Sequence, residues 1–416
     1  MNDRALPEFG QPWRVLEQRL TEYQHGELPQ EGGVFERYWP VYPGSTYLAA
    51  RSAQAMFAHT NLFSINALPS LHRIEHELRA MIGEILAVPD EGAVTITSGG
   101  TESNFLAIKA ARRRGRDRGI SRPNLVIPAT AHPSFDKAGD ELDVEIRRTA
   151  VDSDYRAVAC AAAAAVDSDT ILIAGSAPSY PQGVVDPIEA LAEVARGADI
   201  WMHVDACVGG FLLPFLRQLD DTVPAFALDV PGVWSVSADL HKFGLCLNGI
   251  SSLSLRDATL QRFHTYTQPD VGWCYRSYTR IGFTGSRPGS TLAAAWTTLR
   301  TLGRSGYLDA AASIRATSEA IARGADKIDG VCVPIAPEAG IVVLFPEDGT
   351  DVEAVSAAML SRGWDVSTAQ TPQTLHLLMS ADVEHLVDRF LADLALAVAD
   401  TRAGVVHTGQ EFVYGD

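Results

Sequence analysis

Cysteine is scarce in this chain, and its five cysteines lie far apart in the sequence. They occupy positions 160, 207, 246, 274 and 332, with no C-x-x-C pair and no grouping at metal-ligand spacing. The spacing gives no sign of a metal cluster. It is typical of a protein from a reducing compartment.

The sequence also lacks an excess of positive charge and lacks long hydrophobic runs. Its formal net charge is −17, which excludes a general electrostatic attraction to nucleic acid or to anionic membranes. No window reaches the ~18 consecutive apolar residues of a transmembrane helix, and the N-terminus has neither the basic start nor the apolar run of a signal peptide. We therefore expect a cytoplasmic protein. The basic run at 111–119 is interpreted as a solvated helix end.

Hydrophobic residues make up 46% of the 416 residues and charged residues 20%, which is typical of a globular protein. From about residue 70, helical patterns alternate with short apolar runs, and this alternation predicts a mostly parallel sheet buried on both faces. The predicted strands are 93–98, 171–177, 200–206, 233–238 and 249–255. The predicted helices include 12–24, 70–86 with Ser70 as its N-cap, and 186–196 with Pro187 in its first turn. Beyond about residue 300 the predicted strands and helices are few enough to form only a small α/β unit. We therefore predict an N-terminal arm (1–60), a large domain (61–300) and a small C-terminal domain (301–416).

A strand followed by two glycines and a helix occurs in "TSGGTESN" (97–104). Glycines allow backbone N–H groups to approach an oxyanion closely, and the helix N-terminus adds unpaired donors and partial positive charge. The motif alone is weak, because many turns of this kind are only turns.

Three further side chains stand at or just after the ends of predicted strands. They are His132 in "TAHPSFDKAG", just after the predicted strand "NLVIP", Asp205 in "HVDACVGG" and Lys242 in "SVSADLHKFG". Each has an ordinary alternative, namely a loop histidine, a capping aspartate and a lysine whose amine reaches solvent. Together with the glycine turn they match the needs of pyridoxal phosphate. The lysine forms the Schiff base, the carboxylate keeps the ring nitrogen protonated, the imidazole stacks on the ring and the turn holds the phosphate.

These segments resemble the sphingosine-1-phosphate lyases, which are group II decarboxylases among the fold-type I pyridoxal-phosphate enzymes. The resemblance runs from about 55 to 305, and "EFVYGD" at 411–416 is similar to a late "VYG" of the family. The segments that carry it are "TSGGTESN", "AHPSFDKAG", "GSAPSYPQGVVDPIE", "HVDACVGGF", "SVSADLHKFG" and "GSRPG". The resemblance implies an α/β fold with helices on both faces of the central sheet, and a homodimer with its active sites at the subunit interface.

The resemblance also implies site residues. Lys242 carries the cofactor, Asp205 pairs with the ring nitrogen and His132 stacks. Tyr180 and Tyr414 are candidates for moving protons at the reacting carbon. The residues expected near the cofactor are Gly99, Gly100, Thr101, Ser237, His241 and Ser286. The "GSRPG" loop, with Ser286 and Arg287, is expected near the neighbouring subunit's site.

The sequence departs from the family where the lyases hold the substrate phosphate. The family's "N-P-L-H" stretch reads Asn61, Leu62, Phe63, Ser64 here, and the lysine six residues after the Schiff-base lysine is replaced by Asn248. Hydrogen bonds to charged groups contribute about 1.5–3 kcal/mol each, so the loss of two cationic partners weakens the binding of a dianion. We predict a substrate that need not carry a phosphate, bound by Asn61, Ser64, Asn248 and Arg287.

The leading hypothesis is therefore a carbon–carbon lyase that cleaves Cα–Cβ by a retro-aldol reaction, with Tyr180 or His241 assisting removal of the hydroxyl proton. One alternative is an amino-acid α-decarboxylase in which Arg287 engages the side chain. A β-substituting or bond-forming pyridoxal-phosphate enzyme is another. A non-catalytic homologue is a third, against which the presence of Lys242, Asp205 and His132 argues.

Two remaining features have open or ordinary readings. "HRIEH" (72–76) matches an H-x-x-E-H zinc motif, but no third ligand is evident in the sequence and we expect no metal. The aromatic-rich segments 37–47 and 267–285 fit either a substrate pocket or dimer packing.

Overall fold

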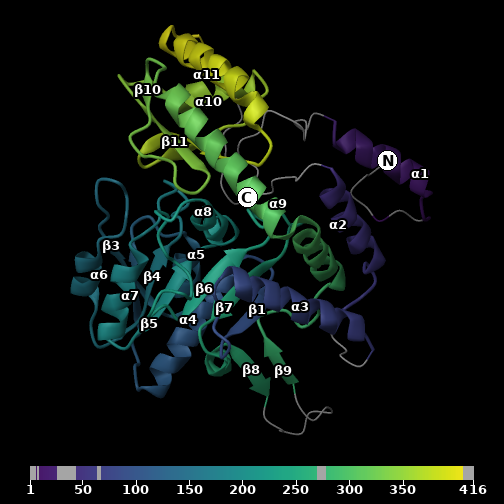
Figure 1. The fold of residues 1–416 in the computed structure, drawn as a ribbon, viewed down its shortest axis with the longest axis vertical. Coiled ribbons are helices and arrows are strands. Elements are labelled where there is room, and N and C mark those ends of the chain that lie inside the picture. Colours follow the sequence, from purple (N-terminus) through teal and green to yellow (C-terminus); the bar gives the residue numbers. More distant parts are fainter. Residues whose placement is uncertain (1–5, 7–8, 26–43, 63–66, 269–277, 406–416) are drawn as a thin grey trace.

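A seven-stranded sheet forms the centre of the protein (Figure 1). The structure, a computed structural model, describes residues 6, 9–25, 44–62, 67–268 and 278–405. The strand order is β1-β7-β6-β5-β4-β2-β3, and β7 alone runs against the others. The strands are β1 (Ala93–Thr97), β2 (Asn124–Pro128), β3 (Glu145–Thr149), β4 (Thr170–Ser176), β5 (Trp201–Asp205), β6 (Ser235–Asp239) and β7 (Ser251–Leu255). The sequence prediction of a mostly parallel sheet is confirmed.

The central strands β2, β4 and β5 are mostly apolar and are buried on both faces, whereas the edge strand β3 is partly exposed. In β2, Leu125 and Ile127 join one apolar core while Val126 joins the other. The first core contains residues of α4 (Gly100–Asp117) and α5 (Ser134–Leu142). The second contains residues of α3 (Pro69–Ile85), α7 (Ile188–Gly197), α8 (Leu213–Leu219) and α9 (Gly289–Ala325). The predicted layer of helices on each face is therefore present.

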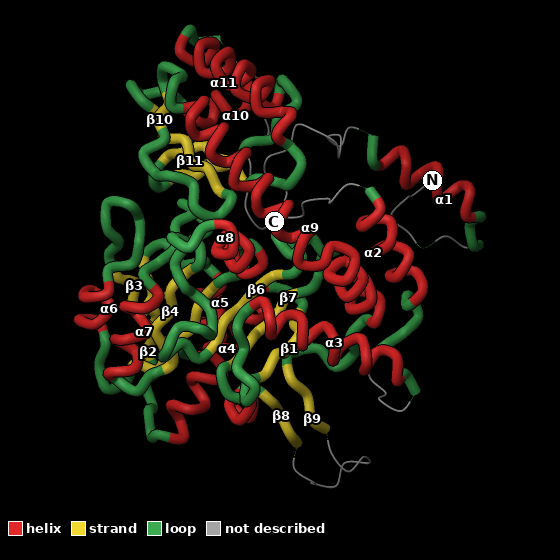
Figure 2. The backbone as a smooth tube through the Cα atoms, viewed as in Figure 1, coloured by secondary structure: helices red, strands yellow, loops and turns green. Residues whose placement is uncertain are grey.

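A second, antiparallel sheet follows α9 in the sequence and has the strand order β10-β11-β13-β12. Figure 2 shows β10 and β11 beside the last two helices of the chain. The strands of this sheet are β10 (Val331–Cys332), β11 (Ile341–Pro346), β12 (Ser367–Gln370) and β13 (Gln373–Leu378), and α10 (Val352–Leu360) and α11 (Val387–Arg402) accompany them. Within α9, Gly303 has φ +60° and marks a kink between two helical segments. The division into domains at residue 300 stays a prediction, and this kink is the local feature closest to it.

The remaining elements are α1 (Trp13–Tyr23), α2 (Ser45–Met56), α6 (Ala159–Ala165), the hairpin β8 (Thr265–Gln268) and β9 (Tyr278–Ile281), and three short 3-10 helices (Gly209–Phe211, Ala258–Phe263 and Glu384–Leu386). In the part of the chain that the structure describes, no helix has the length and apolar character needed to span a bilayer.

Three local predictions need correction. Helix α3 begins at Pro69 with Leu68 as its N-cap, so Ser70 is not the cap. Pro187 is the N-cap residue of α7 and does not lie within its first turn. The basic run does end a helix, but Arg113 is half-buried and donates to the main-chain carbonyls of Phe263 and Thr265, where a 3-10 helix meets β8, so the run is only partly solvated.

Candidate active site

A cavity of about 350 Å³ opens where the parallel strands end and α4 begins. Ligands collect at this edge in open α/β sheets. The lining combines the glycine turn with polar side chains from several strand ends. Its described residues are Ser98, Gly99, Gly100, Thr101, Glu102, Asn104, His132, Ser176, Pro178, Tyr180, Asp205, Cys207, Val208, Asp239, His241, Lys242, Asn248 and Gly249. Most of the predicted cofactor residues are thus brought together.

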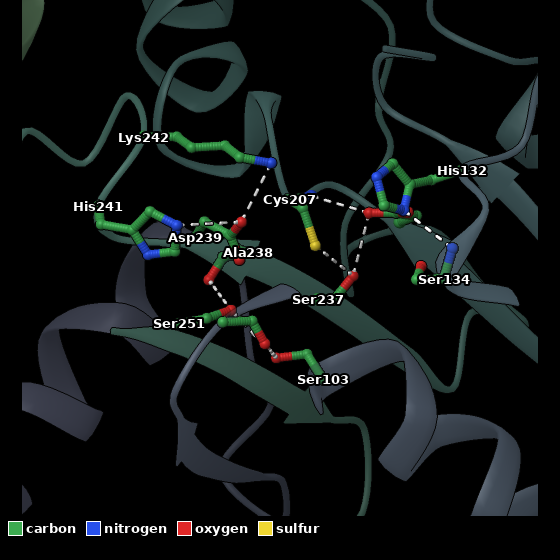
Figure 3. Close-up of polar contacts among 12 residues, drawn as sticks. Ser103, His132, Ser134, Cys207, Ser237, Ala238, Asp239, His241, Lys242 and Ser251 are labelled. Carbon is green, nitrogen blue, oxygen red and sulfur yellow. Dashed lines mark hydrogen bonds and ion pairs between the residues drawn. The ribbon is translucent and has the colours of Figure 1, made fainter. Parts of the chain in front are cut away.

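Lys242 follows β6 and extends over Asp239, the last residue of that strand (Figure 3). Its Nζ atom lies 3.1 Å from Oδ2 of Asp239, whose side chain is 2% exposed. Burial by itself lowers the pKa of Lys242. The Asp239 carboxylate and, more weakly, Asp205 outweigh burial and raise the pKa above its usual value. The free amine is therefore held as an ammonium.

Asp205 is the last residue of β5 and is almost completely buried. Its Oδ2 accepts a hydrogen bond from the side-chain amide of Asn104 (2.9 Å), and its Oδ1 accepts one from the backbone N–H of Cys207 (3.1 Å). Burial raises the pKa of this carboxyl, but His132 and the hydrogen bonds from Cys207 outweigh burial and hold the pKa below its usual value. A carboxylate anion therefore faces the cavity.

His132 lies in the turn between β2 and α5, and its ring is half-buried. The backbone N–H of Ser134 donates to Nδ1 of this ring (3.1 Å), so the proton of the neutral ring is on Nε2. Burial lowers the pKa of His132. A neutral imidazole at this place fits the predicted stacking role.

His241 lines the cavity next to Lys242, whereas Ser237 lies deeper, beneath the cavity. In His241, Nδ1 donates to the main-chain carbonyl of Ile250 (2.7 Å), which leaves Nε2 as an acceptor in the neutral ring, 3.7 Å from Oδ2 of Asp239. Ser237 is fully buried beneath the cavity, where its hydroxyl contacts Asp205 Oδ1 at 3.4 Å. Ser237 therefore supports the carboxylate from below and does not line the cavity.

The glycine turn is packed tightly against the rest of the site. A Cβ atom on Gly100 would lie 2.5 Å from Sγ of Cys207 and 3.0 Å from the carboxylate oxygens of Asp239. Glu102, in the first turn of α4, accepts hydrogen bonds from the backbone N–H and hydroxyl of Ser98, both at 2.7 Å. Its other oxygen accepts from the backbone N–H of Phe283 (3.1 Å). Glu102 thus fixes the turn and ties it to the loop after β9.

The predicted substrate residues are only partly in this cavity. Asn248 and Tyr180 line it. Arg287 instead forms an ion pair with the buried Glu75 (2.9 Å), and its backbone N–H donates to the side chain of Asn61. Ser286 and Arg287 line a smaller cavity of about 130 Å³ that shares Ser98, Glu102 and Gly249 with the larger one. Ser64 and Tyr414, and the segments 37–43 and 269–277, lie outside the described residues.

Sequence reasoning missed several residues of the site, among them Asn104, Glu102 and Asp239. Asn104 and Glu102 lie within the quoted "TSGGTESN", and their places on α4 bring them to the turn and to Asp205. Asp239 stands three residues before Lys242. That spacing, at the end of a buried strand, was the one signal that an acid would accompany the amine.

The donor set suits pyridoxal phosphate. The cavity presents an amine, a buried carboxylate, a neutral imidazole and the N-terminus of an 18-residue helix. A helix N-terminus binds phosphate through its free N–H groups, and an amine with a carboxylate fits the aldehyde and the ring nitrogen. The residues present therefore fit this cofactor.

Comparison with known proteins agrees with this conclusion. Residues 45–343 match the family model described as pyridoxal-dependent decarboxylase conserved domain. A sphingosine-1-phosphate lyase of Dictyostelium discoideum is 36% identical, over 95% of this chain and 77% of that protein. A probable L-tyrosine/L-aspartate decarboxylase of Methanothermobacter thermautotrophicus is 30% identical, over 84% of this chain and 94% of the relative. The solved structure of a sphingosine-1-phosphate lyase from Burkholderia pseudomallei superposes with a TM-score of 0.90 at 33% identity, over 96% of this chain and 94% of that one.

Proposed function

This chain belongs to the pyridoxal-dependent decarboxylase family, and on that premise we propose that it cleaves the Cα–Cβ bond of an amino substrate that carries no phosphate. It is a pyridoxal-phosphate-dependent carbon–carbon lyase related to the sphingosine-1-phosphate lyases. The observation that carries the proposal is the amine of Lys242, held beside Asp239 in one cavity with Asp205 and the start of α4.

Each residue has a proposed task. Lys242 holds the cofactor covalently, Asp205 holds its ring nitrogen, His132 covers the ring, and Gly99, Gly100 and Thr101 at the start of α4 receive the phosphate. When bound, the cofactor supplies an electron-accepting ring that stabilises negative charge on the reacting carbon. Ser237 supports Asp205 through its hydroxyl.

Retro-aldol cleavage requires a base for the hydroxyl proton on Cβ. In the neutral His241 ring, Nε2 has no proton because Nδ1 donates to Ile250. This Nε2 lies 3.7 Å from Oδ2 of Asp239. Tyr180 lines the same cavity and is the second candidate. Tyr414, outside the described residues, stays a prediction.

The charges of the cavity support a substrate without a phosphate. Among the described residues of this chain, no arginine lines it, and three acidic side chains (Glu102, Asp205 and Asp239) accompany the one lysine. Arg287 is already paired with Glu75, which leaves less of its charge for a substrate. A substrate phosphate would be a second dianion beside that of the cofactor and would meet repulsion from these carboxylates, whereas an uncharged hydroxyl or apolar group would not.

Product analysis tests the reaction. Purified protein with pyridoxal phosphate is incubated with β-hydroxy amino acids, amino alcohols with and without a phosphate, and amino acids such as tyrosine and aspartate. We expect aldehyde release from phosphate-free amino alcohols or β-hydroxy amino acids. Release of carbon dioxide instead would favour an α-decarboxylase, the alternative supported by the archaeal relative.

Borohydride reduction tests the covalent anchor. Reduction followed by peptide mapping should place a pyridoxyl group on Lys242, and Lys242→Ala should abolish the visible absorbance of the bound cofactor. The proposal fails if the tag is found elsewhere or if Lys242→Ala keeps its turnover.

We also propose that the protein works as a homodimer in the cytoplasm, with Ser286 and Arg287 near the partner's site. Exposed apolar side chains on α1 and α2, among them Leu20, Leu48 and Met56, support a covered surface there. The four cysteines in the described residues are free thiols, which fits a reducing compartment. Light scattering at several concentrations tests the dimer, and a single-subunit mass with full activity would contradict it.

A further inference from the structure

Beneath the cavity, buried polar side chains connect Asp205 to the interior of the sheet. His203 lies two residues before Asp205 on β5 and has no exposed surface. Its Nδ1 lies 2.8 Å from the hydroxyl of Ser235, and its Nε2 lies 3.0 Å from Oδ1 of Asn104. These contacts are outside the roles assigned above.

The Trp201 end of this set is compatible with a single direction for all of its hydrogen bonds. The indole N–H of Trp201 can only donate, and it donates to Oγ of Ser235 (2.8 Å). The Ser235 hydroxyl is then free to donate to Nδ1 of His203. With Nδ1 as an acceptor, the proton of the neutral ring is on Nε2, which donates to Oδ1 of Asn104.

The Asp205 end of the set fixes that direction. The Asp205 carboxylate can only accept, so Asn104 must present its NH₂ group to Oδ2. The second hydrogen of that NH₂ group goes to Oγ of Ser134 (3.0 Å). The amide oxygen of Asn104 therefore faces His203, so Nε2 of that ring must donate to it and Nδ1 accepts from the Ser235 hydroxyl. Ser237 Oγ also lies near Nε2 of His203, at 3.5 Å.

We propose that Trp201, Ser235, His203 and Asn104 form a one-way hydrogen-bond chain that orients the Asp205 carboxylate toward the cofactor ring, with His203 as its positioning residue. The inference rests on the proposed role of Asp205. Such a chain polarises each member in the same direction, and its last member presents donors to the anion. Burial lowers the pKa of His203 to about 4, so the ring stays neutral and keeps its direction at neutral pH.

The hydrogen-bond chain is tested first by the position of the proton on the His203 ring. Nitrogen NMR of the holoenzyme with labelled histidine, assigned by loss of the signal in His203→Gln, should show a neutral ring with its proton on Nε2 from about pH 5 to 9. A ring with its proton on Nδ1, or a cation within that range, would overturn the proposal. This measurement does not depend on turnover, so it remains informative if the proposed reaction is wrong.

The second test compares three variants by the rate of cofactor loss and by the visible spectrum. His203→Leu removes both hydrogen bonds and should speed cofactor loss about tenfold or more. His203→Gln keeps an acceptor and a donor on one side chain and should restore most of the wild-type behaviour. His264→Leu is the matched control, because His264 is also fully buried, also has its pKa lowered to about 4 by burial, and makes no contact with Asp205.

The outcomes distinguish an effect of the hydrogen-bond chain from a general loss of packing in the core. If His203→Leu and His264→Leu lower the thermal stability similarly but only His203→Leu loosens the cofactor and shifts its spectrum, the chain is supported. Equal cofactor loss in both variants, or no rescue by His203→Gln, would overturn it. If the wild type itself holds no cofactor on Lys242, the proposed function fails, and the same NMR measurement on the cofactor-free protein still decides whether the hydrogen-bond chain exists.

Discussion

The ring of His376 is hydrogen-bonded to the backbone of Tyr180, which lies 196 residues earlier in the sequence. Its Nε2 donates to the main-chain carbonyl of Tyr180 (3.0 Å), and the two ring centroids are 4.7 Å apart. His376 is a buried residue of β13, in the antiparallel sheet, whereas Tyr180 lies in the loop between β4 and α7 and lines the cavity. The second sheet thus helps to place a candidate proton carrier.

Replacing His376 should therefore change turnover through Tyr180. In His376→Phe the ring contact is kept, but the hydrogen bond to the carbonyl is lost. We expect kcat to fall about tenfold with a smaller change in KM, because the loss of one buried hydrogen bond costs about 1–2 kcal/mol. Ser367→Ala on the paired strand is the control, since Ser367 lies opposite His376 and its hydroxyl has no hydrogen-bond partner among the described residues. Equal kinetics for both variants would contradict a link to Tyr180.

Asn248→Lys should restore part of the binding of a phosphorylated substrate. Asn248 is exposed at the cavity, where the related lyases have a lysine, and a new ammonium there would pair with a dianion. We expect KM for a phosphorylated amino alcohol to fall about tenfold, with little change for the unphosphorylated compound. Steady-state kinetics on the matched pair of compounds measures this, and Asn248→Gln controls for size. A uniform change for both compounds would remove the support for a lost phosphate site.

Asp239→Asn should shift the pH dependence of cofactor uptake. Only the unprotonated amine of Lys242 attacks an aldehyde, and Asp239 raises the pKa of that amine. The uptake rate of the wild-type apoprotein should therefore still rise with pH at about pH 9, whereas the variant should reach its plateau at a lower pH. Visible absorbance after mixing with pyridoxal phosphate follows the rate. Asp329→Asn, a change at a carboxylate that is 87% exposed, is the control. Identical pH profiles would show that Asp239 does not govern the amine.

Gly100→Ala should disrupt the turn at the start of α4. The added methyl group would lie 2.5 Å from Sγ of Cys207, so either the turn or β5 with its following loop must move. We expect cofactor affinity to fall by a factor of ten or more, on the scale of about 1–3 kcal/mol for an overpacked site. Gly197→Ala is the matched control because nothing lies within 4 Å of its Cβ position at the end of α7. Fluorescence titration with cofactor should separate the two.

The part of the site that could be predicted from sequence is the part at strand ends. His132, Asp205 and Lys242 follow apolar runs, and parallel strands place their carboxyl ends at one edge. The position of Arg287 could not be predicted in this way. Its partner Glu75 is the acid of the zinc-like "HRIEH" motif, 212 residues away, and only the packing of α3 near that loop brings the two charges together.

The ends of the helices and the buried hydrogen bonds could also not be predicted from the sequence. Ser70 fits the composition of an N-cap, but the first turn begins one residue earlier because Pro69 is favoured there. The partners of His203 come from β6 and from α4, so its place in "HVDACVGG" does not reveal them. Such contacts depend on strand order and register, which a local pattern does not contain.

The reversed direction of β7 has a consequence for how specificity can change. Because β7 runs against β6, the segment 240–250 leaves and re-enters the sheet at the same edge, and Lys242 and Asn248 lie on this single short return. A longer or shorter segment between β6 and β7 would displace both side chains at once, the proposed cofactor-binding Lys242 together with Asn248. Substrate preference can therefore change by substitution of residue 248 while the length of this segment stays constant. Insertions or deletions in the segment should abolish activity.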